Sequence, residues 1–358
     1  MRICVFARNS LTSSQGTGHT RVAVVADPQL TDRTSYVFAS SGTALWFVRY
    51  LCDTYLKRAF SMVRSLRPDA VVFMGDLMDG ARSYDSKEYA LEYERFREIA
   101  RLRPGTPEFH VAGNHDIGLG HSFCAACAQR FTDKMGPLRY KASIDNVTFI
   151  AVDTVSTAGN IDAFSCMAHR RFRRAAHSFT SKVSESRVAL DWRGVADTPA
   201  PVADASFQGE MDCRPRILLT HIPLFRPEET HCGLGRAKGN GFIRYLLRFT
   251  FQTTVAKELS AVLLEATRPD LVLSGDDHDQ CHVEHPAPWR GGEAMSGWSK
   301  TLRGFGVEER TVGTVSMLQG NIYPSIALCN ALAHSQSSFF YICLSWLYRS
   351  PPNLLNFS

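Results

Sequence analysis

Residues that can bind metal ions recur in this sequence directly after short apolar runs. They are Asp27, Gln29, Asp76, Asp79, Asn114, His115, Asp116, His221, Asp276 and His278. One aspartate after a strand is usually a turn former or a helix cap. Five clusters in one chain, however, form a set of carboxylate, amide and imidazole ligands that suits two divalent ions such as Mn, Fe or Zn. Two such ions can share a water, lower its pKa and stabilise the entering and leaving oxygens at phosphorus.

The runs before these residues have the character of buried β-strands. They are β-branched or apolar, and Gly, Asp, Asn or His bounds them, at residues 22–26, 70–74, 109–112, 147–152, 217–220 and 271–273. Short apolar runs with such boundaries are typical of strands that are covered on both faces of a sheet. Because open α/β sheets place their chemistry at the carboxyl ends of strands, we expect the polar clusters to meet there.

Helical patterns separate the predicted strands. Apolar residues recur at helical spacing from Leu45 to Leu66, before Pro68, and again from Val255 to Ala266; a third helix is expected over 87–99. Strand and helix alternate over about residues 20–280, which predicts one α/β domain. The segment 162–215 is rich in Arg, Ser, Ala and Asp and has weak periodicity. We expect an insertion or long surface loop there, with a substrate lid as the alternative.

Composition excludes several classes of protein. The 358 residues are 44% hydrophobic and 21% charged, which excludes wholesale disorder. A net charge of +5 without a dense Lys/Arg block argues against nucleic-acid binding. The chain has no run of the roughly 18 to 20 apolar residues that a spanning helix needs, and residues 339–348 come nearest. We therefore expect a soluble or peripheral chain. The close pair Cys124 and Cys127 is interpreted as structural or disulfide-bonded.

The clusters together resemble the five signature blocks of the calcineurin-like metallophosphoesterases. The blocks are D27-P-Q29, G75-D76-L-M-D79, G113-N114-H115-D116, H221 and G275-D276-D-H278. The resemblance covers residues 21–330 and leaves 1–20 and 331–358 unassigned. It implies a four-layer α/β/β/α sandwich with mixed sheets and a metal site at the carboxyl ends of the strands.

The resemblance also implies a role for each site residue. The first metal would be held by Asp27, Gln29 and His278, the second by Asn114, His221 and Asp276, and Asp76 would bridge them. His115 would bind no metal and would protonate the leaving alkoxide, with Asp116 fixing its tautomer. Asp79 would orient the site from behind the ligands.

Two of these positions depart from the wider superfamily. Gln29 and Asp276 offer oxygen ligands where imidazole is usual. Because hard oxygen suits Mn better than Zn, we expect two Mn ions as cofactors.

Three strings narrow the resemblance to one subfamily. D27-P-Q-L30, G113-N-H-D-I-G118 and S274-G-D-D-H-D-Q-C-H282 resemble endoplasmic-reticulum enzymes that remove ethanolamine phosphate from the mannoses of glycosylphosphatidylinositol (GPI) anchors. A later block around Trp298 and Tyr323 is also similar. The implied protein is a membrane-associated phosphodiesterase of the early secretory pathway that uses a metal-bound hydroxide, with any anchor in termini that are missing or altered here.

Other functions stay open at this point. The same metal site could act on nucleotides, phosphoproteins or another phospho-head group. A scaffold without catalysis is disfavoured because every ligand position keeps a coordinating atom. Candidates for substrate contact are His121, His282 and Trp298, with Lys300 beside them. We expect Asp277 and Asp279 on a solvated loop face, and leave His285 undecided. Asn146 begins an N-glycosylation pattern.

Overall fold

The computed structural model describes the parts of the chain that build the expected domain. The described residues are 19–119, 122–144, 147–158, 215–233, 236, 243, 254–287, 306–319, 324–332 and 342–347. Outside them lie nearly all of the expected insertion at 162–215, and also His121, Asn146, Trp298 and Lys300.

One mixed sheet contains both the start and the end of the described chain. Its strands are β1 (His19–Val25), β2 (Ala70–Phe73), β3 (Glu108–His110), β10 (Ser325–Leu332) and β11 (Ile342–Leu347). Their order is β11-β10-β1-β2-β3, with β1, β2 and β3 parallel and β10 antiparallel to both of its neighbours.

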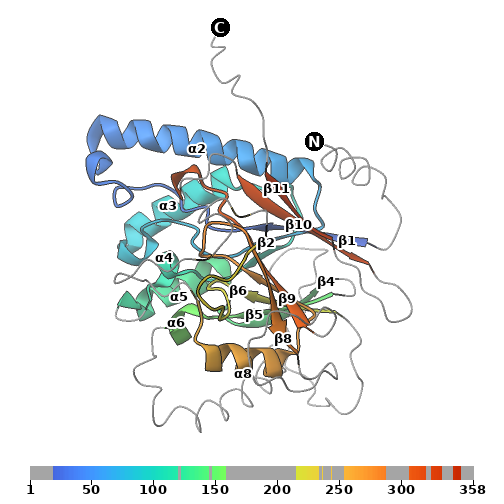
Figure 1. Cartoon of the computed structure of the whole chain (residues 1–358). Helices are drawn as coiled ribbons and strands as arrows, with labels where there is room; N and C mark the ends of the chain where they lie inside the picture. The colour runs from blue at the N-terminus through green and yellow to red at the C-terminus, as the bar shows by residue number, and fades with distance from the viewer. Residues whose placement is uncertain are drawn as a thin grey trace, which may run out of the picture.

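The second sheet is also mixed. Its strands are β4 (Tyr140–Ile144), β5 (Val147–Val152), β6 (Arg216–Thr220), β7 (Leu271–Ser274), β8 (Cys281–Pro286) and β9 (Gly306–Thr311). Their order is β4-β5-β6-β7-β9-β8, and β5, β6, β7 and β9 are parallel. The two sheets face each other in the middle of the molecule (Figure 1).

Alternate residues of the strands separate the core into an inner and an outer layer. In β1, Val22 and Val24 belong to the same apolar cluster as Phe149 and Leu219 of the other sheet. Ala23, which lies between them in sequence, belongs to the cluster that includes the helices. Since side chains on a strand alternate between the two faces, this pattern places one core between the sheets and another under the helices.

Helices cover the outer faces. The first sheet carries α2 (Gly42–Ser65) and α3 (Ser86–Ile99), and the second carries α8 (Lys257–Thr267) (Figure 1). Phe60 of α2 packs on Phe73 of β2, with ring centroids 6.0 Å apart. The molecule is thus the expected four-layer α/β/β/α sandwich. The other described helices are α4 (Asn114–Ile117), α5 (Ala125–Met135) and α6 (Val155–Ala158), with 3-10 turns η1 (Val37–Ala39), η2 (Ala81–Ser83) and η7 (Met317–Gln319).

The C-terminal segment adds to the sheet beyond the span of the resemblance. The limit at residue 330 falls inside β10, and β11 arises from the apolar run 339–348. Among the described residues, no helix has the length and apolar character needed to cross a bilayer.

The structure confirms the predicted pairing of two cysteines and contains a second disulfide among the described residues. Cys124 and Cys127 form a disulfide. A second disulfide, Cys232–Cys281, was not predicted and joins residues 49 positions apart.

Candidate metal centre

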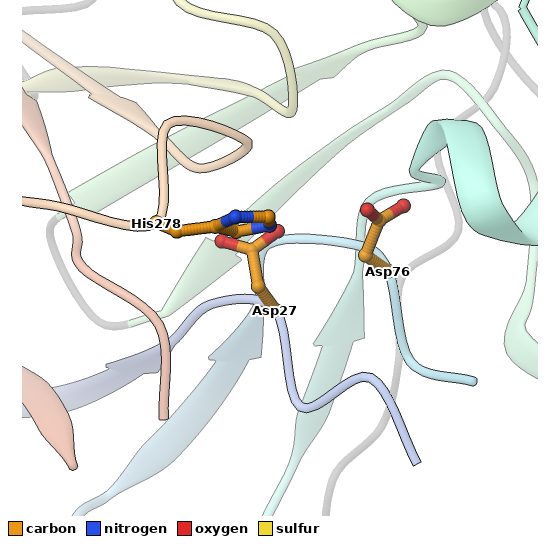
Figure 2. Close-up of side chains that lie close together, drawn as sticks. All are labelled: Asp27, Asp76 and His278. Atoms are coloured by element: carbon orange, nitrogen blue, oxygen red, sulfur yellow. The ribbon is translucent and has the colours of Figure 1, made fainter. Parts of the chain in front are cut away.

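Five strand ends bring the expected ligands to one place. Asp27, Asp76 and His278 each present a ligand atom, and these atoms lie within 4.8 Å of one another. His221 and Asp276 form a second such group with the same Asp76. Figure 2 shows Asp27 beside the His278 ring, with Asp76 facing them from the end of the neighbouring strand. Two groups that share one carboxylate are the arrangement expected for two bridged cations.

Two amide side chains complete the cluster. The Gln29 amide nitrogen lies 3.2 Å from Asp76 Oδ2 and 3.1 Å from His278 Nε2. Asn114 Oδ1 lies 3.1 Å from His221 Nε2. Because a half-turn of an amide exchanges its oxygen and nitrogen, Gln29 can present either atom to the centre. All seven side chains expected as ligands therefore lie together.

The backbone is strained where these ligands leave their strands. Asp27, Gln29, Asp76, Asp276 and His278 have φ values of 51°, 39°, 52°, 63° and 60°. Such positive angles are uncommon outside glycine, and they cluster at functional sites. Within the described residues, these five make up most of the eight non-glycine positions with positive φ.

Two glycines make room for the strand ends to approach each other. A Cβ on Gly75 would lie 2.5 Å from His221 Nδ1, and one on Gly113 would lie 2.0 Å from Asp76 Oδ1. Gly75 also has a φ of 98°. The glycines that precede Asp76 and Asn114 in the sequence are therefore required by the packing of the site itself.

His221 is oriented with one ring nitrogen towards the centre. Its Nδ1–H donates to the Met74 carbonyl at 2.6 Å, which leaves Nε2 as the ligand atom. Nε2 lies 3.4 Å from Asp76 Oδ1 and 3.5 Å from Asp276 Oδ1. Burial lowers the pKa of His221, but the charge of Asp76 and the hydrogen bond to Asp276 outweigh it, so the pKa lies well above its usual value.

The buried acids fit a pair of divalent cations. Asp27 is fully buried, and its Oδ2 has no hydrogen-bond partner among the residues that the structure describes. Burial raises the pKa of Asp27 well above its usual value; His221 opposes this shift, and the nearby charges of Asp76 and Asp276 add to it. Burial also raises the pKa of Asp76, but His221 and His115 lower it more. An unpaired carboxylate oxygen amid like charges fits a positive ion at this point.

His115 borders the cluster without joining either group. Its Nδ1–H donates to the Asp79 carbonyl at 2.6 Å and lies 3.0 Å from Asp79 Oδ1. Its Nε2 lies 3.8 Å from Asp76 Oδ2, and the side chain is 22% exposed. Burial lowers the pKa of His115, but Asp76 and Asp79 raise it to about 9. Cations bound nearby would lower this pKa again.

The expectation that Asp116 fixes the His115 ring is corrected by these contacts. Asp116 Oδ2 accepts from the backbone N–H groups of Asp76 and Gly113, both at 2.9 Å, and Oδ1 accepts from Leu77 at 3.0 Å. Asp116 therefore ties the loops after β2 and β3 together, and Asp79 orients the ring. The pKa of Asp116 is raised to about 7, first by burial and then by Asp76.

The expected solvated face at Asp277 and Asp279 is wrong. Asp277 pairs with Arg226 at 2.7 Å and with Arg236 at 2.8 Å. Asp279 is 3% exposed. Neither carboxylate faces open solvent: the arginines of the segment that follows β6 cover Asp277, and Asp279 is buried.

The two histidines further along have different surroundings. His285 is fully buried, and its Nε2 donates to Glu309 at 2.6 Å, so its role is structural. His282 lies on the edge strand β8, is 42% exposed and lies 3.4 Å from Glu308. Its contact with substrate stays a prediction.

Sequence reasoning missed several residues that hold the ligands. Thr314 Oγ1 donates to the Asp27 carbonyl at 2.7 Å, and its N–H donates to the His278 carbonyl at 3.2 Å. Arg226 and Arg236 were also missed. No spacing marks these residues, because they act through the loops and come from segments remote in sequence.

The sequence of this chain is similar to known phosphoesterases. The sequence profile "Calcineurin-like phosphoesterase" matches residues 20–280. Cell division control protein 1 of Saccharomyces cerevisiae is 31% identical over 317 residues, which cover 88% of this chain and 56% of that protein. Metallophosphoesterase 1 of Ailuropoda melanoleuca is 28% identical over 68% of this chain and 58% of its own length. The chain thus spans a little over half the length of these curated relatives.

The solved structure of a dimetal phosphatase also aligns with this chain. The dimetal phosphatase from Danio rerio covers 92% of this chain at 14% identity, with a TM-score of 0.42. At this TM-score the alignment adds no weight to the two-sheet architecture, which is evident from the chain itself.

Proposed function

Because the chain belongs to the calcineurin-like phosphoesterase family, we propose that it is a phosphodiesterase that removes ethanolamine phosphate from the mannose of a GPI-type glycan. The chain is a metal-dependent phosphoester hydrolase by family and by its candidate metal groups. The observation that carries the hydrolytic part of this proposal is the position of Asp76, which belongs to both groups, beside a histidine that belongs to neither.

The proposed roles divide between ligands and a proton donor. Asp27, Gln29 and His278 would hold one cation, and Asn114, His221 and Asp276 the other, with Asp76 between them. When bound, two divalent ions supply an activated water and neutralise charge on the phosphate.

His115 is the residue proposed to protonate the leaving group. Its Nδ1 is held by Asp79, so Nε2 is the atom free to face substrate. A ring fixed in this way can carry a proton on Nε2 and deliver it to the leaving oxygen.

The substrate is proposed from the subfamily resemblance and from the distant relatives. The strings at 27–30, 113–118 and 274–282 support it, as does similarity to proteins named metallophosphoesterase 1. We also propose that the chain acts at a membrane of the early secretory pathway. Two disulfides within the described residues support an oxidising compartment, because such bonds are rare in the cytosol.

Manganese is the proposed metal. The amide of Gln29 and the carboxylate of Asp276 give the centre more hard oxygen ligands than an imidazole-rich site would have. Reconstitution of metal-free protein with Mn should restore turnover. Full recovery with Zn alone, and none with Mn, would contradict this assignment.

The substrate proposal is tested with purified protein and Mn. An ethanolamine-phosphate mannoside should be hydrolysed with a higher kcat/KM than a phosphomonoester, a nucleotide or a phosphopeptide. His115→Ala protein serves as the control for contaminating hydrolases. Preference for a nucleotide or a phosphopeptide would replace the GPI assignment, and no hydrolysis of any ester would favour a scaffold.

A further inference from the structure

The loop after β7 contributes to both metal groups within three residues. Asp276 belongs to the group with His221, and His278 belongs to the group with Asp27. The spacing of the two proposed cations therefore depends on the shape of residues 276–278. Asp276 and His278 both have positive φ, so contacts outside the loop must stabilise this shape.

Asp277, which lies between these two residues in sequence, forms ion pairs with two arginines. Arg236 donates from both terminal nitrogens to the two carboxylate oxygens, at 2.8 and 3.0 Å. Arg226 donates to Oδ2 at 2.7 Å and to Thr311 Oγ1 on β9 at 3.0 Å. The Asp277 carboxylate is thus held by side chains of the segment that follows β6.

These arginines are unusually well buried. The Arg226 side chain is 1% exposed and that of Arg236 is 7% exposed. Burying a guanidinium costs it the hydration that water supplies, which an ion pair returns only in part, and apolar residues of similar size would often be as stable. A buried ionic group next to a strained ligand loop is therefore better explained by positioning than by stability.

A disulfide connects the same two segments. Cys232 lies between the two arginines in sequence, and its partner Cys281 lies three residues after His278. The His282 N–H also donates to the Cys232 carbonyl at 3.1 Å. Residues 226–233 and Arg236 are therefore connected to the ligand loop at Asp277, and to the start of β8 at Cys281 and His282.

We propose that Arg226 and Arg236, acting through Asp277, are positioning residues that set the separation of Asp276 and His278 and thereby the spacing of the two metal ions. This inference rests on the two-metal centre and not on the substrate. It makes a distinct prediction: weakening the grip on Asp277 disturbs both metal positions together, whereas loss of one ligand disturbs its own position.

The test is Mn binding to metal-free protein, measured by calorimetry, with the EPR spectrum reporting coupling between the two ions. Asp277→Asn should weaken both binding events by about 10- to 100-fold and alter the coupled spectrum. His278→Ala should weaken one event much more than the other. Neither readout needs a substrate, so a wrong substrate assignment leaves this test intact.

The chain offers a matched control in Asp53→Asn. Asp53 is held by Arg95 through two hydrogen bonds of 2.9 and 2.6 Å, and its exposure of 21% resembles the 12% of Asp277. This variant should leave Mn binding unchanged even if it melts at a lower temperature. The same loss of Mn binding in Asp53→Asn would indicate general loosening and overturn the proposal.

Two further outcomes would overturn it. One is wild-type affinity and coupling in Asp277→Asn, and the other is loss of only the position that His278→Ala removes. Should Asp277→Asn fail to fold, Arg236→Lys keeps the charge and removes the two-pronged contact. It should weaken both events in the same direction, and unchanged binding would count against the proposal in the same way.

Discussion

The loops after β1 and β7 carry similar pairs of candidate metal ligands but are held in different ways. Asp27 and Gln29 are two residues apart, as are Asp276 and His278, and all four have positive φ. The first loop is held by its main chain: Gln29 N–H donates to the Asp76 carbonyl at 2.8 Å, and Leu30 N–H donates to Leu77 at 3.1 Å.

The second loop also has main-chain bonds, such as Asp277 N–H to the Gly275 carbonyl at 2.8 Å and Thr314 N–H to the His278 carbonyl at 3.2 Å, but side chains hold it as well. Its middle residue, Asp277, is held by Arg226 and Arg236, whereas Pro28 in the first loop has no polar side chain to hold. Main-chain hydrogen bonds survive most substitutions, but ion pairs to the Asp277 carboxylate are lost when that one residue is replaced. The comparison indicates that the same local geometry can be robust in one loop and sensitive in the other.

The largest effect is expected where the two loops meet, at Asp76. Asp76→Asn keeps the shape of the side chain and removes the charge that both metal groups share. We expect Mn to be lost from both positions and kcat to fall by about a thousandfold or more, since several kcal/mol of charge stabilisation is removed. Metal analysis and diester hydrolysis measure this, and full metal content with normal kcat would refute the shared role.

His115 belongs to neither loop, so its replacement should change catalysis without changing metal binding. His115→Ala should lower kcat by about 10²- to 10⁴-fold for a substrate with a poor leaving group, while the Mn content stays at the wild-type level. A nitrophenyl ester, whose leaving group needs little protonation, should lose less activity. Equal losses for both esters would argue against a general acid at this position.

Loss of the Cys232–Cys281 disulfide should affect the second loop and leave the first one intact. For residues 49 positions apart, chain entropy predicts a loss of about 4 kcal/mol in the free energy of unfolding. Cys232→Ser should also weaken Mn binding, by about tenfold, because Cys281 follows the second loop. Denaturant unfolding and Mn titration measure the two effects, with Cys124→Ser as the control that keeps Mn affinity. Loss of stability without any change in Mn binding would mean that the disulfide stabilises the fold but does not position the second loop.

The smallest effect is expected at Pro28. Pro28→Ala frees the unfolded chain and should cost about 1 kcal/mol of stability or less, since the loop keeps its main-chain bonds. Mn affinity should match the wild type, in contrast with Asp277→Asn. A loss at Pro28 as large as that at Asp277 would remove the distinction between the loops.

Sequence reasoning found the elements that carry an apolar signal. The strands before Asp27, Asp76 and His221 were predicted from β-branched runs, and α2, α3 and α8 from their apolar stripes. The strands β8 and β9 were missed because residues such as Glu308 and Glu309 interrupt any apolar pattern. Glu309 is nonetheless fully buried, beside His285 and the N–H of Leu224, and only the folded chain brings these partners together.

The candidate site was predictable for a related reason. The candidate ligands follow the ends of strands, which the sequence marks, and in the structure their seven side chains lie together. That they bind metal stays a prediction. Their supports were only partly predictable. Asp79 was expected to orient the site, but no spacing shows that it contacts the His115 ring while the Asp116 carboxylate accepts from backbone N–H groups. Asp277 shows the same limit, since an acidic residue in a loop gives no sign of the arginines that bury it.

The central claim, two cations bridged by Asp76, is tested most directly by a crystal structure of the Mn-loaded protein with anomalous scattering measured at the Mn edge. The account predicts two peaks about 3.5 to 4 Å apart, one beside Asp27 and His278 and the other beside His221 and Asp276. A single peak, or two peaks that do not share Asp76, would contradict it.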